Sequence, residues 1–315
     1  MEENFPTDTW GLILGGSSGF GLATAHALAR HGMHLAIVHR DRRGALARIE
    51  PEFAEIRARG VELATFNADA LDASVRARIL DEIALRLGDR GRLRVMLHSI
   101  AFGNLKLIAA ERPADPSAAR ALAAAIGVEE RRVVEAADRL LTGGVDALHP
   151  IASRPTYSQD SFIDEEDLAR TIHSMGTSLL GWTQETSKRG LFAADARVLG
   201  LTSEGNTVAW KGYAAVAAAK AALESIARAI AVEMAPYGIR CNVIQAGITD
   251  TPALRLIPGS DHLKAQARLR NPFRRLTTPQ DVASVVYLLC RDEAAWINGE
   301  VIRVDGGEHV SGSSA

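Results

Sequence analysis

Short apolar runs alternate with stretches of helical periodicity along most of this chain, and this alternation constrains its fold more than any other feature. The apolar runs lie at residues 11–14, 34–39, 61–69, 93–100, 196–203, 239–247 and 300–307. Runs that alternate with helices in this way form right-handed βαβ units, whose strands assemble into a parallel sheet. The pattern therefore predicts an α/β fold built on a doubly wound parallel sheet.

The alternation breaks after the fourth run. Residues of roughly 104–160 contain no strand candidate, many alanines and several proline and glycine residues. Asp115, Pro116 and Ser117 form a helix-capping signal, and apolar residues recur at 133, 134, 137, 140 and 141. We expect a single domain over 1–315 with a helical insertion at 104–160, placed at the carboxyl edge of the sheet where substrates enter such folds.

The later part of the chain resumes the alternation. Helical patterns cover 164–188, a stretch that begins at Tyr213, and 279–292. A polar stretch between 248 and 278 has the composition of a mobile loop. No repeat or low-complexity linker divides the chain, which is consistent with one domain.

The composition is typical of a soluble globular protein and favours a small-molecule substrate over nucleic acid or a membrane as its partner. The 315 residues are 47% hydrophobic and 23% charged, and the formal net charge is -2, which gives no bulk attraction to nucleic acid or an anionic membrane. The N-terminal segment lacks an apolar core of the secretory type, and no run of about 18 apolar residues occurs. The two cysteines, Cys241 and Cys290, lie in apolar contexts that fit structural thiols in a reducing compartment. We expect a cytoplasmic protein.

A glycine-rich turn follows the first apolar run and precedes the first helical stretch. Its residues are Gly15, Ser17, Ser18, Gly19, Phe20 and Gly21. Glycines let the backbone approach a dinucleotide pyrophosphate, and the free N–H groups of a helix N-terminus attract its charge. We therefore predict a dinucleotide site of the Rossmann type. Two alternatives are a turn without a ligand and a hydrolase nucleophile elbow at Ser17, although an elbow on the first strand would leave no earlier strands.

The end of the second apolar run indicates which cofactor binds. An acidic side chain there would bind the ribose 2'-hydroxyl, whereas arginine would neutralise a 2'-phosphate. His39 stands where the acid is expected, and Arg40 and Arg42 beside it favour a phosphate. We predict NADPH. Asp41 keeps NADH as the less favoured alternative, and the arginines could instead be a solvated helix start.

Tyr213 and Lys220 carry the predicted chemistry. They lie seven positions apart in a predicted helix, so they differ by about 20° in azimuth and reach one site. A lysine ammonium near a phenol favours the phenolate, and the same lysine can bind a cofactor ribose. As an isolated pair they could equally be ordinary surface residues.

The sequence around this pair resembles a known superfamily. Segments 201–253 and 273–307 are similar to the C-terminal half of short-chain dehydrogenases/reductases. The Tyr-x6-Lys spacing, together with LHSIAFG at 97–103, resembles the enoyl-acyl-carrier-protein reductase branch. The likeness covers nearly the whole chain outside 104–160.

This resemblance implies NADPH-dependent reduction of the 2,3 double bond of an enoyl thioester, as in fatty-acid or polyketide metabolism. Tyr213 would hydrogen-bond the thioester carbonyl, and Lys220 would hold the nicotinamide ribose. The substrate would be a small acyl thioester, on coenzyme A or a carrier protein, and relatives suggest a homotetramer or dimer. The cofactor would also be lined by residues after the fourth and sixth strands: Ser99, Ile100, Ala101, Ala246, Gly247, Ile248, Thr249 and Thr251.

Ser203 departs from the reductase pattern, because many of these reductases carry an aromatic residue ten positions before the tyrosine. Ser203 could be a second donor to the thioester, a strand-end hydroxyl without a role, or a sign of a ketone substrate. A carbonyl reductase or alcohol dehydrogenase, acting on a ketone or β-ketoacyl substrate, is therefore the alternative. A non-catalytic dinucleotide sensor that uses the insertion to bind a partner is a third interpretation.

The remaining polar candidates are weaker. Asp69, followed by Ala70 at the end of the third run, is expected either to meet the adenine or to cap the next helix. His98 and His173 lack the neighbouring cysteines or carboxylates of a metal site, so we expect core or surface histidines and no metal. The insertion is expected to roof the acyl pocket or to alter which carrier can dock.

Overall fold

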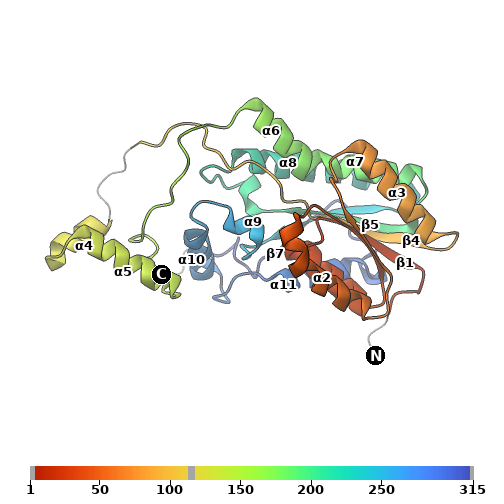
Figure 1. Ribbon diagram of the computed structural model, residues 1–315, viewed down its shortest axis with the longest axis horizontal. Helices are drawn as coiled ribbons and strands as arrows, with labels where there is room; N and C mark the ends of the chain where they lie inside the picture. The colour runs from red at the N-terminus through yellow and green to blue at the C-terminus, as the bar shows by residue number, and fades with distance from the viewer. Residues whose placement is uncertain (1–3, 113–117, 313–315) are drawn as a thin grey trace.

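A parallel sheet forms the centre of the computed structural model, which describes residues 4–112 and 118–312. Its strand order is β3-β2-β1-β4-β5-β6-β7 (Figure 1). The strands are β1 (Thr9–Leu14), β2 (His34–His39), β3 (Leu63–Asn67), β4 (Arg92–His98), β5 (Phe192–Thr202), β6 (Arg240–Ala246) and β7 (Val301–Val304). Every pair is parallel. The predicted doubly wound α/β fold is confirmed, and the order reverses between β1 and β4, where such sheets bind ligands.

Helices cover both faces of the sheet, as Figure 1 shows. One face packs against α3 (Ala73–Leu87), α7 (Ser178–Lys188) and α8 (Ala214–Glu233), and the other against α1 (Gly19–Arg30), α2 (Arg43–Arg57) and α11 (Pro279–Leu289). Strands buried on both faces are apolar at successive positions rather than alternately. In β2, Leu35, Ala36, Ile37 and Val38 are all fully buried. This is why the sequence reads as unbroken apolar runs.

Some elements differ from their predictions. The stretch 164–188 is divided into α6 (Glu165–Ile172), a π-helical turn η2 (His173–Thr177) and α7. The polar stretch 248–278 contains α9 (Pro252–Arg255) and α10 (Ser260–Arg270). Ala265 and Ala267 are the buried residues of α10, and most of its polar residues are partly covered by their neighbours.

Segment 104–160 forms a long excursion from the sheet. It contains α4 (Ala118–Ile126), α5 (Glu130–Thr142) and a short turn η1 (Asp146–Leu148). The capping signal at 115–117 lies outside the described residues. Figure 1 shows α5 between α4 and α10, and Ala137 and Leu141 of α5 pack with Ala265 of α10. Arg268 of α10 makes two hydrogen bonds to the Asp146 carboxylate, at 2.7 and 2.5 Å.

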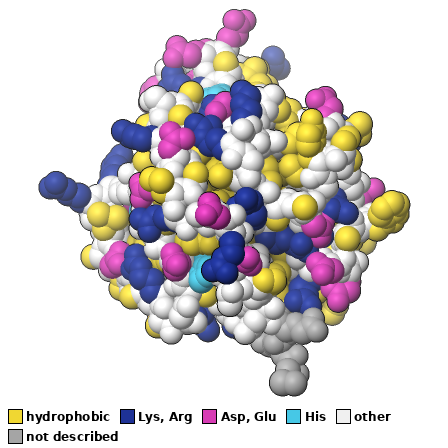
Figure 2. All heavy atoms as spheres, turned by 90° about the vertical axis from the view of Figure 1, so that its right-hand side faces the viewer, with side chains coloured by type: hydrophobic (Ala, Val, Ile, Leu, Met, Phe, Trp, Pro, Cys, Tyr) yellow, Lys and Arg dark blue, Asp and Glu magenta, His cyan; other side chains and the backbone are white. Residues whose placement is uncertain are grey.

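The surface carries charges of both signs. Figure 2 shows lysines and arginines interspersed with carboxylates on the face that it presents, with apolar side chains between them. Among the described residues, no helix has both the length and the apolar character needed to cross a bilayer.

Candidate active site

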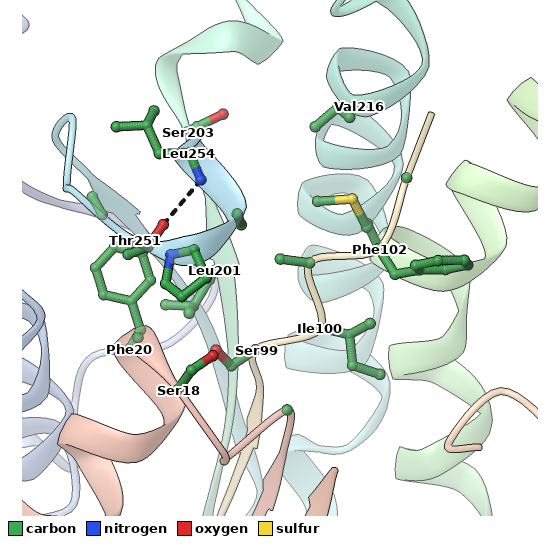
Figure 3. A pocket seen from close by; sticks show the side chains of 18 of the residues that line it. Ser18, Phe20, Ser99, Ile100, Phe102, Leu201, Ser203, Val216, Thr251 and Leu254 are labelled. Carbon is green, nitrogen blue, oxygen red and sulfur yellow. Dashed lines mark hydrogen bonds between the residues drawn. The ribbon is translucent and has the colours of Figure 1, made fainter. Parts of the chain in front are cut away.

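A cavity of about 480 Å³ opens over the carboxyl ends of the strands. Its lining comes from the segments that follow β1 to β7, together with α8 and α9. Figure 3 labels side chains around it that come from the segments after β1, β4, β5 and β6 and from α8 and α9. The cavity lies where the strand order reverses between β1 and β4. The loops that follow these two strands run in opposite directions, and a crevice forms between them.

Most of the predicted site residues line this one cavity. They are Gly15, Ser17, Ser18, Gly19, Phe20, His39, Arg40, Asp69, Ala70, Ser99, Ile100, Ala101, Ser203, Tyr213, Lys220, Ala246, Gly247, Ile248, Thr249 and Thr251. Gly21 and Arg42 are not part of its lining. Gly21 lies buried in the first turn of α1, and Arg42 is the exposed residue that precedes α2.

The glycine turn has the shape that a pyrophosphate needs. Gly15 and Gly19 have φ of +87° and +53°, values that favour glycine. A Cβ on Gly15 would lie 2.5 Å from Ser99 O, and one on Gly21 would lie 2.2 Å from Gly15 O. Ser18 precedes α1 without a side-chain capping bond, so the first N–H groups of this helix are left for an anion. These residues fit a dinucleotide.

The corner after β2 holds its charged residues in specific contacts. His39 Nδ1 lies 2.8 Å from Asp41 Oδ2, and the Asp41 backbone is held on both sides by the Asn67 side chain. Arg40 donates to Asp69 Oδ2 at 3.0 Å, and its guanidinium lies 4.4 Å from the ring centre of Phe102. Asp69 does not cap the next helix, because Asp72 does so by accepting from the backbone of the first turn.

Tyr213 stands at the start of α8 rather than within it, as its N-cap residue. Its ring is buried and meets Trp210 edge-on at 5.2 Å between centroids. Its hydroxyl lies 3.2 Å from Ser203 Oγ. Burial raises the pKa of Tyr213 above its usual value, and the contact with Ser203 opposes this. That Lys220 favours the phenolate stays a prediction, since burial is the larger of the two causes of this shift.

Lys220 is buried two turns along α8. Its Nζ donates to the Leu201 carbonyl at 2.8 Å, which aims the ammonium at the end of β5. Burial lowers the pKa of Lys220 to about 8, and the carboxylate of Glu224 acts in the opposite direction. Glu224 in turn accepts hydrogen bonds from Thr202 and Asn206. The pKa of Lys220 is thus set by two opposing effects, desolvation and the nearby Glu224 carboxylate.

The loop after β6 closes one side of the cavity. Thr251 caps α9 by accepting from Leu254 N at 3.2 Å, the dashed contact in Figure 3. A Cβ on Gly19 would lie 3.5 Å from the Thr251 methyl group, so this loop meets the glycine turn.

The far end of the cavity is apolar and was not predicted from the sequence. Its side chains are Phe102, Leu105, Met175, Leu201, Trp210, Val216, Leu254, Leu256 and Ile257. Leu105 is the residue of segment 104–160 in this lining. The signals available were Trp210, three positions before Tyr213, and the apolar PALRLI stretch at 252–257. Neither Trp210 nor the 252–257 stretch belongs to a sequence motif that would distinguish the wall of a pocket from the hydrophobic core.

His98 and the two cysteines lie outside the cavity lining. His98 is buried with Nε2 2.7 Å from Ser178 Oγ, and burial lowers its pKa to about 3. Burial raises the pKa of both free cysteines to about 12. Among the described residues, His26, Glu52 and Glu55 bring metal-type ligand atoms together. They lie on α1 and α2, outside the cavity lining.

Comparisons with known proteins agree on one family. The family profile described as Enoyl-(Acyl carrier protein) reductase matches residues 128–309. A 1-cyclohexenylcarbonyl-CoA reductase of Streptomyces collinus is 36% identical over 35% of this chain and 40% of its own length. An enoyl-[acyl-carrier-protein] reductase [NADH] of Aquifex aeolicus is 41% identical over 32% of this chain and 37% of its own. This chain thus spans less than half of each of these curated relatives.

Two further matches extend over nearly the whole chain. A tropinone reductase homolog of Arabidopsis thaliana is 24% identical over 96% of this chain and 91% of its own length. The crystal structure of the Aquifex aeolicus reductase superposes with a TM-score of 0.70 at 23% identity, and covers 96% of this chain and 97% of that one. The structural likeness supports the fold.

Proposed function

The chain belongs to the enoyl-(acyl carrier protein) reductase family of short-chain dehydrogenases/reductases, and from this we propose that it reduces the 2,3 double bond of an enoyl thioester with NADPH. One observation carries the proposal: Tyr213 and Lys220 line the same cavity as the glycine turn. A hydrogen-bond donor and a buried cation thereby stand at one end of a dinucleotide-shaped site, beside an apolar surface.

Some residues of the cavity would bind the cofactor, and Tyr213 would stabilise the negative charge that develops on the substrate. A bound nicotinamide cofactor would supply the hydride. Tyr213 donates a hydrogen bond to the thioester carbonyl oxygen, where negative charge develops as the double bond is reduced. A donor that is already oriented is most effective there, because it costs no reorganisation. The raised pKa of Tyr213 keeps the phenol protonated and able to donate near neutral pH.

Lys220 and the glycine turn would hold the cofactor. The Lys220 ammonium is fixed by the Leu201 carbonyl and would bind the nicotinamide ribose. The N–H groups at the start of α1 would bind the pyrophosphate. Ser99 to Ala101 and the loop from Ala246 to Thr251 would line the remainder.

Preference for NADPH rests on the corner after β2. Arg40 lines the cavity there, with Arg42 exposed nearby. The Asp41 carboxylate is engaged by His39, which reduces its capacity to bind a ribose diol. NADH is the alternative cofactor, and the Aquifex aeolicus relative is named for it.

The apolar end of the cavity suits the acyl chain of a thioester. A carrier protein or coenzyme A would extend from the cavity mouth, and segment 104–160 would affect which carrier docks. Removing 106–155 should therefore change chain-length or carrier preference. Full turnover with unchanged preference would contradict that role. We further propose a homo-oligomer, tetramer or dimer, in the cytoplasm.

A second candidate is reduction of a carbonyl, and the position of Ser203 favours it. Ser203 Oγ lies 3.2 Å from the Tyr213 hydroxyl, so the two could donate together to one substrate oxygen. A β-ketoacyl thioester would present such an oxygen at the reacting carbon, whereas an enoyl thioester presents it two carbons away.

Cofactor oxidation followed by absorbance separates the candidates. Crotonyl and longer 2-enoyl thioesters are compared with a β-ketoacyl thioester at equal concentrations of NADPH. We expect faster oxidation with the enoyl substrates. Preference for the ketone would replace the first proposal by the second, and binding of NADPH without turnover on either substrate would indicate a dinucleotide sensor.

Variants of the two central residues test the assignment of roles. Tyr213→Phe removes the donor, and we expect kcat to fall by roughly 10²- to 10³-fold, as for loss of one preorganised donor. Lys220→Met should weaken cofactor binding as well. Tyr237→Phe is the matched control, because Tyr237 is an exposed tyrosine. Unchanged catalysis in a folded Tyr213→Phe variant would refute the proposal.

A further inference from the structure

Two buried carboxylates at one end of the cavity share a single guanidinium. Glu204 follows β5, Glu308 follows β7, and Arg270 ends α10. Arg270 Nη2 donates to Glu204 Oε1 at 2.6 Å and to Glu308 Oε1 at 2.8 Å. The side chains of Glu204 and Glu308 are 10% and 2% exposed, and that of Arg270 is 31% exposed. Arg270 thus joins three elements that are distant in the sequence.

The Glu308 carboxylate reaches the loop after β6. Its second oxygen accepts from Ile248 N at 3.3 Å. A Cβ on Gly247 would lie only 2.9 Å from the same oxygen, so the carboxylate lies directly against the loop backbone. Gly247 and Ile248 both line the cavity, in the part proposed to hold the nicotinamide. A shift of Glu308 would therefore move this wall.

Glu204 reaches the catalytic end instead. It directly follows Ser203, whose hydroxyl lies 3.2 Å from that of Tyr213. A Cβ on the next residue, Gly205, would lie 2.4 Å from the Tyr213 ring, so the backbone of this turn touches the ring. A shift of Glu204 would change the surroundings of both hydroxyls.

The arrangement depends on the charge of Arg270. Burial raises the pKa of Glu308 above its usual value, and Arg270 opposes this effect. His309 also lies beside the pair, with Nδ1 3.5 Å from Glu204 Oε2. Removing one partner of a buried ion pair leaves a charge without compensation. Without Arg270, the two carboxylates would lose their shared partner, and either repulsion between them or proton uptake by Glu308 would change the contacts of both.

We infer that Arg270 is a positioning residue that aligns the loop after β6 with the Tyr213 hydroxyl. It acts through Glu308 on one side and through Glu204 on the other. Its effect on catalysis rests on the proposed function, whereas its effect on the cofactor loop requires only that a nicotinamide cofactor binds. Because Arg270 belongs to the helix that follows the apolar PALRLI stretch, it also links the substrate end to the cofactor end.

The test compares Arg270→Met and Arg270→Lys with Arg268→Met. Arg268 lies on the same helix, has a side chain 30% exposed and is paired with a carboxylate away from the cavity lining. Dissociation constants for NADPH and NADH are measured by quenching of tryptophan fluorescence, without substrate. Then kcat and KM are measured with the best substrate found.

We expect Arg270→Met to weaken cofactor binding about tenfold and to lower kcat about 10²-fold, since small misplacements near reacting groups have large effects. Arg270→Lys keeps a cation and should recover part of both losses. Cofactor affinity and kcat equal to the wild type in both Arg270 variants would overturn the inference, as would equal losses in Arg268→Met. If Arg270→Met does not fold, Arg270→Lys and Glu308→Gln carry the same comparison. A wild type that binds neither cofactor would refute the proposed function instead.

Discussion

Lys220 carries its charge in a buried position, which makes the ammonium sensitive to pH. Its pKa of about 8 lies below the ordinary value of a lysine because burial disfavours the charge. We expect kcat/KM for the cofactor, which reports on groups of the free enzyme, to fall as pH rises through about 8. Glu224→Gln removes the carboxylate that favours the ammonium, so the fall should begin at lower pH.

The control for this prediction is Glu233→Gln, because Glu233 is an exposed acid at the end of the same helix. Its pH profile should match that of the wild type. A Glu224→Gln profile that coincides with the wild type, or moves to higher pH, would contradict the assignment of the basic limb to Lys220.

His98 makes stability depend on pH. Its folded pKa is about 3, and an unfolded histidine titrates near 6.5. Between these values the unfolded chain binds a proton that the folded chain does not, so the free energy of unfolding decreases as pH falls below about 6.5. From pH 7 to pH 5 this group should contribute a loss of about 2 kcal/mol.

Urea denaturation at these two pH values measures the loss. His98→Gln should be less stable than the wild type at pH 7 but should show a smaller decrease at pH 5. His173→Gln changes an exposed histidine and should keep the wild-type difference. An unchanged decrease in His98→Gln would rule out a protonation penalty at this position.

The sequence predicts a strand or helix correctly where the burial of its residues matches the local pattern of apolar residues. The apolar runs predicted the strands because the central strands of a sheet covered on both faces are apolar at most successive positions. The sequence does not predict α10, because its polar composition reveals neither its two buried alanines nor the excursion that packs against Ala265. Tyr213 was placed within α8 because periodicity cannot distinguish an N-cap residue from the first turn.

The contact between the excursion and α10 yields a prediction at this scale. Arg268 and Asp146 form a two-point ion pair that is partly buried. Arg268→Met should raise the rate of amide hydrogen exchange in α5 and η1, because α5 loses one of its anchors on the main body. Exchange in α3, on the opposite side, serves as the internal reference. Protection of α5 equal to the wild type would show that apolar contacts alone hold it.

The sequence predicts those parts of the site that lie at the carboxyl ends of strands. Gly15, Ser99 and Gly247 each follow a strand and His39 ends one, and parallel strands bring such positions to one edge. The apolar wall and the Glu204–Arg270–Glu308 network could not be predicted, because they arise where α9, α10 and the segment after β7 meet. No spacing of residues in the sequence predicts the contacts between these elements.

Cofactor binding should stabilise the molecule as a whole. A ligand at about 100 times its dissociation constant adds about 2.7 kcal/mol to the stability of the folded state. We expect NADPH to raise the melting temperature by several degrees and NADH, at equal concentration, by less. Arg40→Ala should reduce this difference, whereas Arg59→Ala, an exposed arginine outside the cavity lining, should preserve it. A larger shift with NADH would assign the chain to the other cofactor.

The continuity of the cavity, from Arg40 to Ile257, has a practical consequence for inhibitor chemistry. Among the described residues one continuous lining joins the half proposed to bind the nucleotide to the apolar half, so one covalently linked molecule with a nucleotide head and an aliphatic tail could occupy both. Tethering makes the second binding event intramolecular, and the combined affinity can then exceed that of either fragment by orders of magnitude. Selectivity for this protein over its relatives would come from the aliphatic tail, because the apolar residues that contact the tail belong to no family motif.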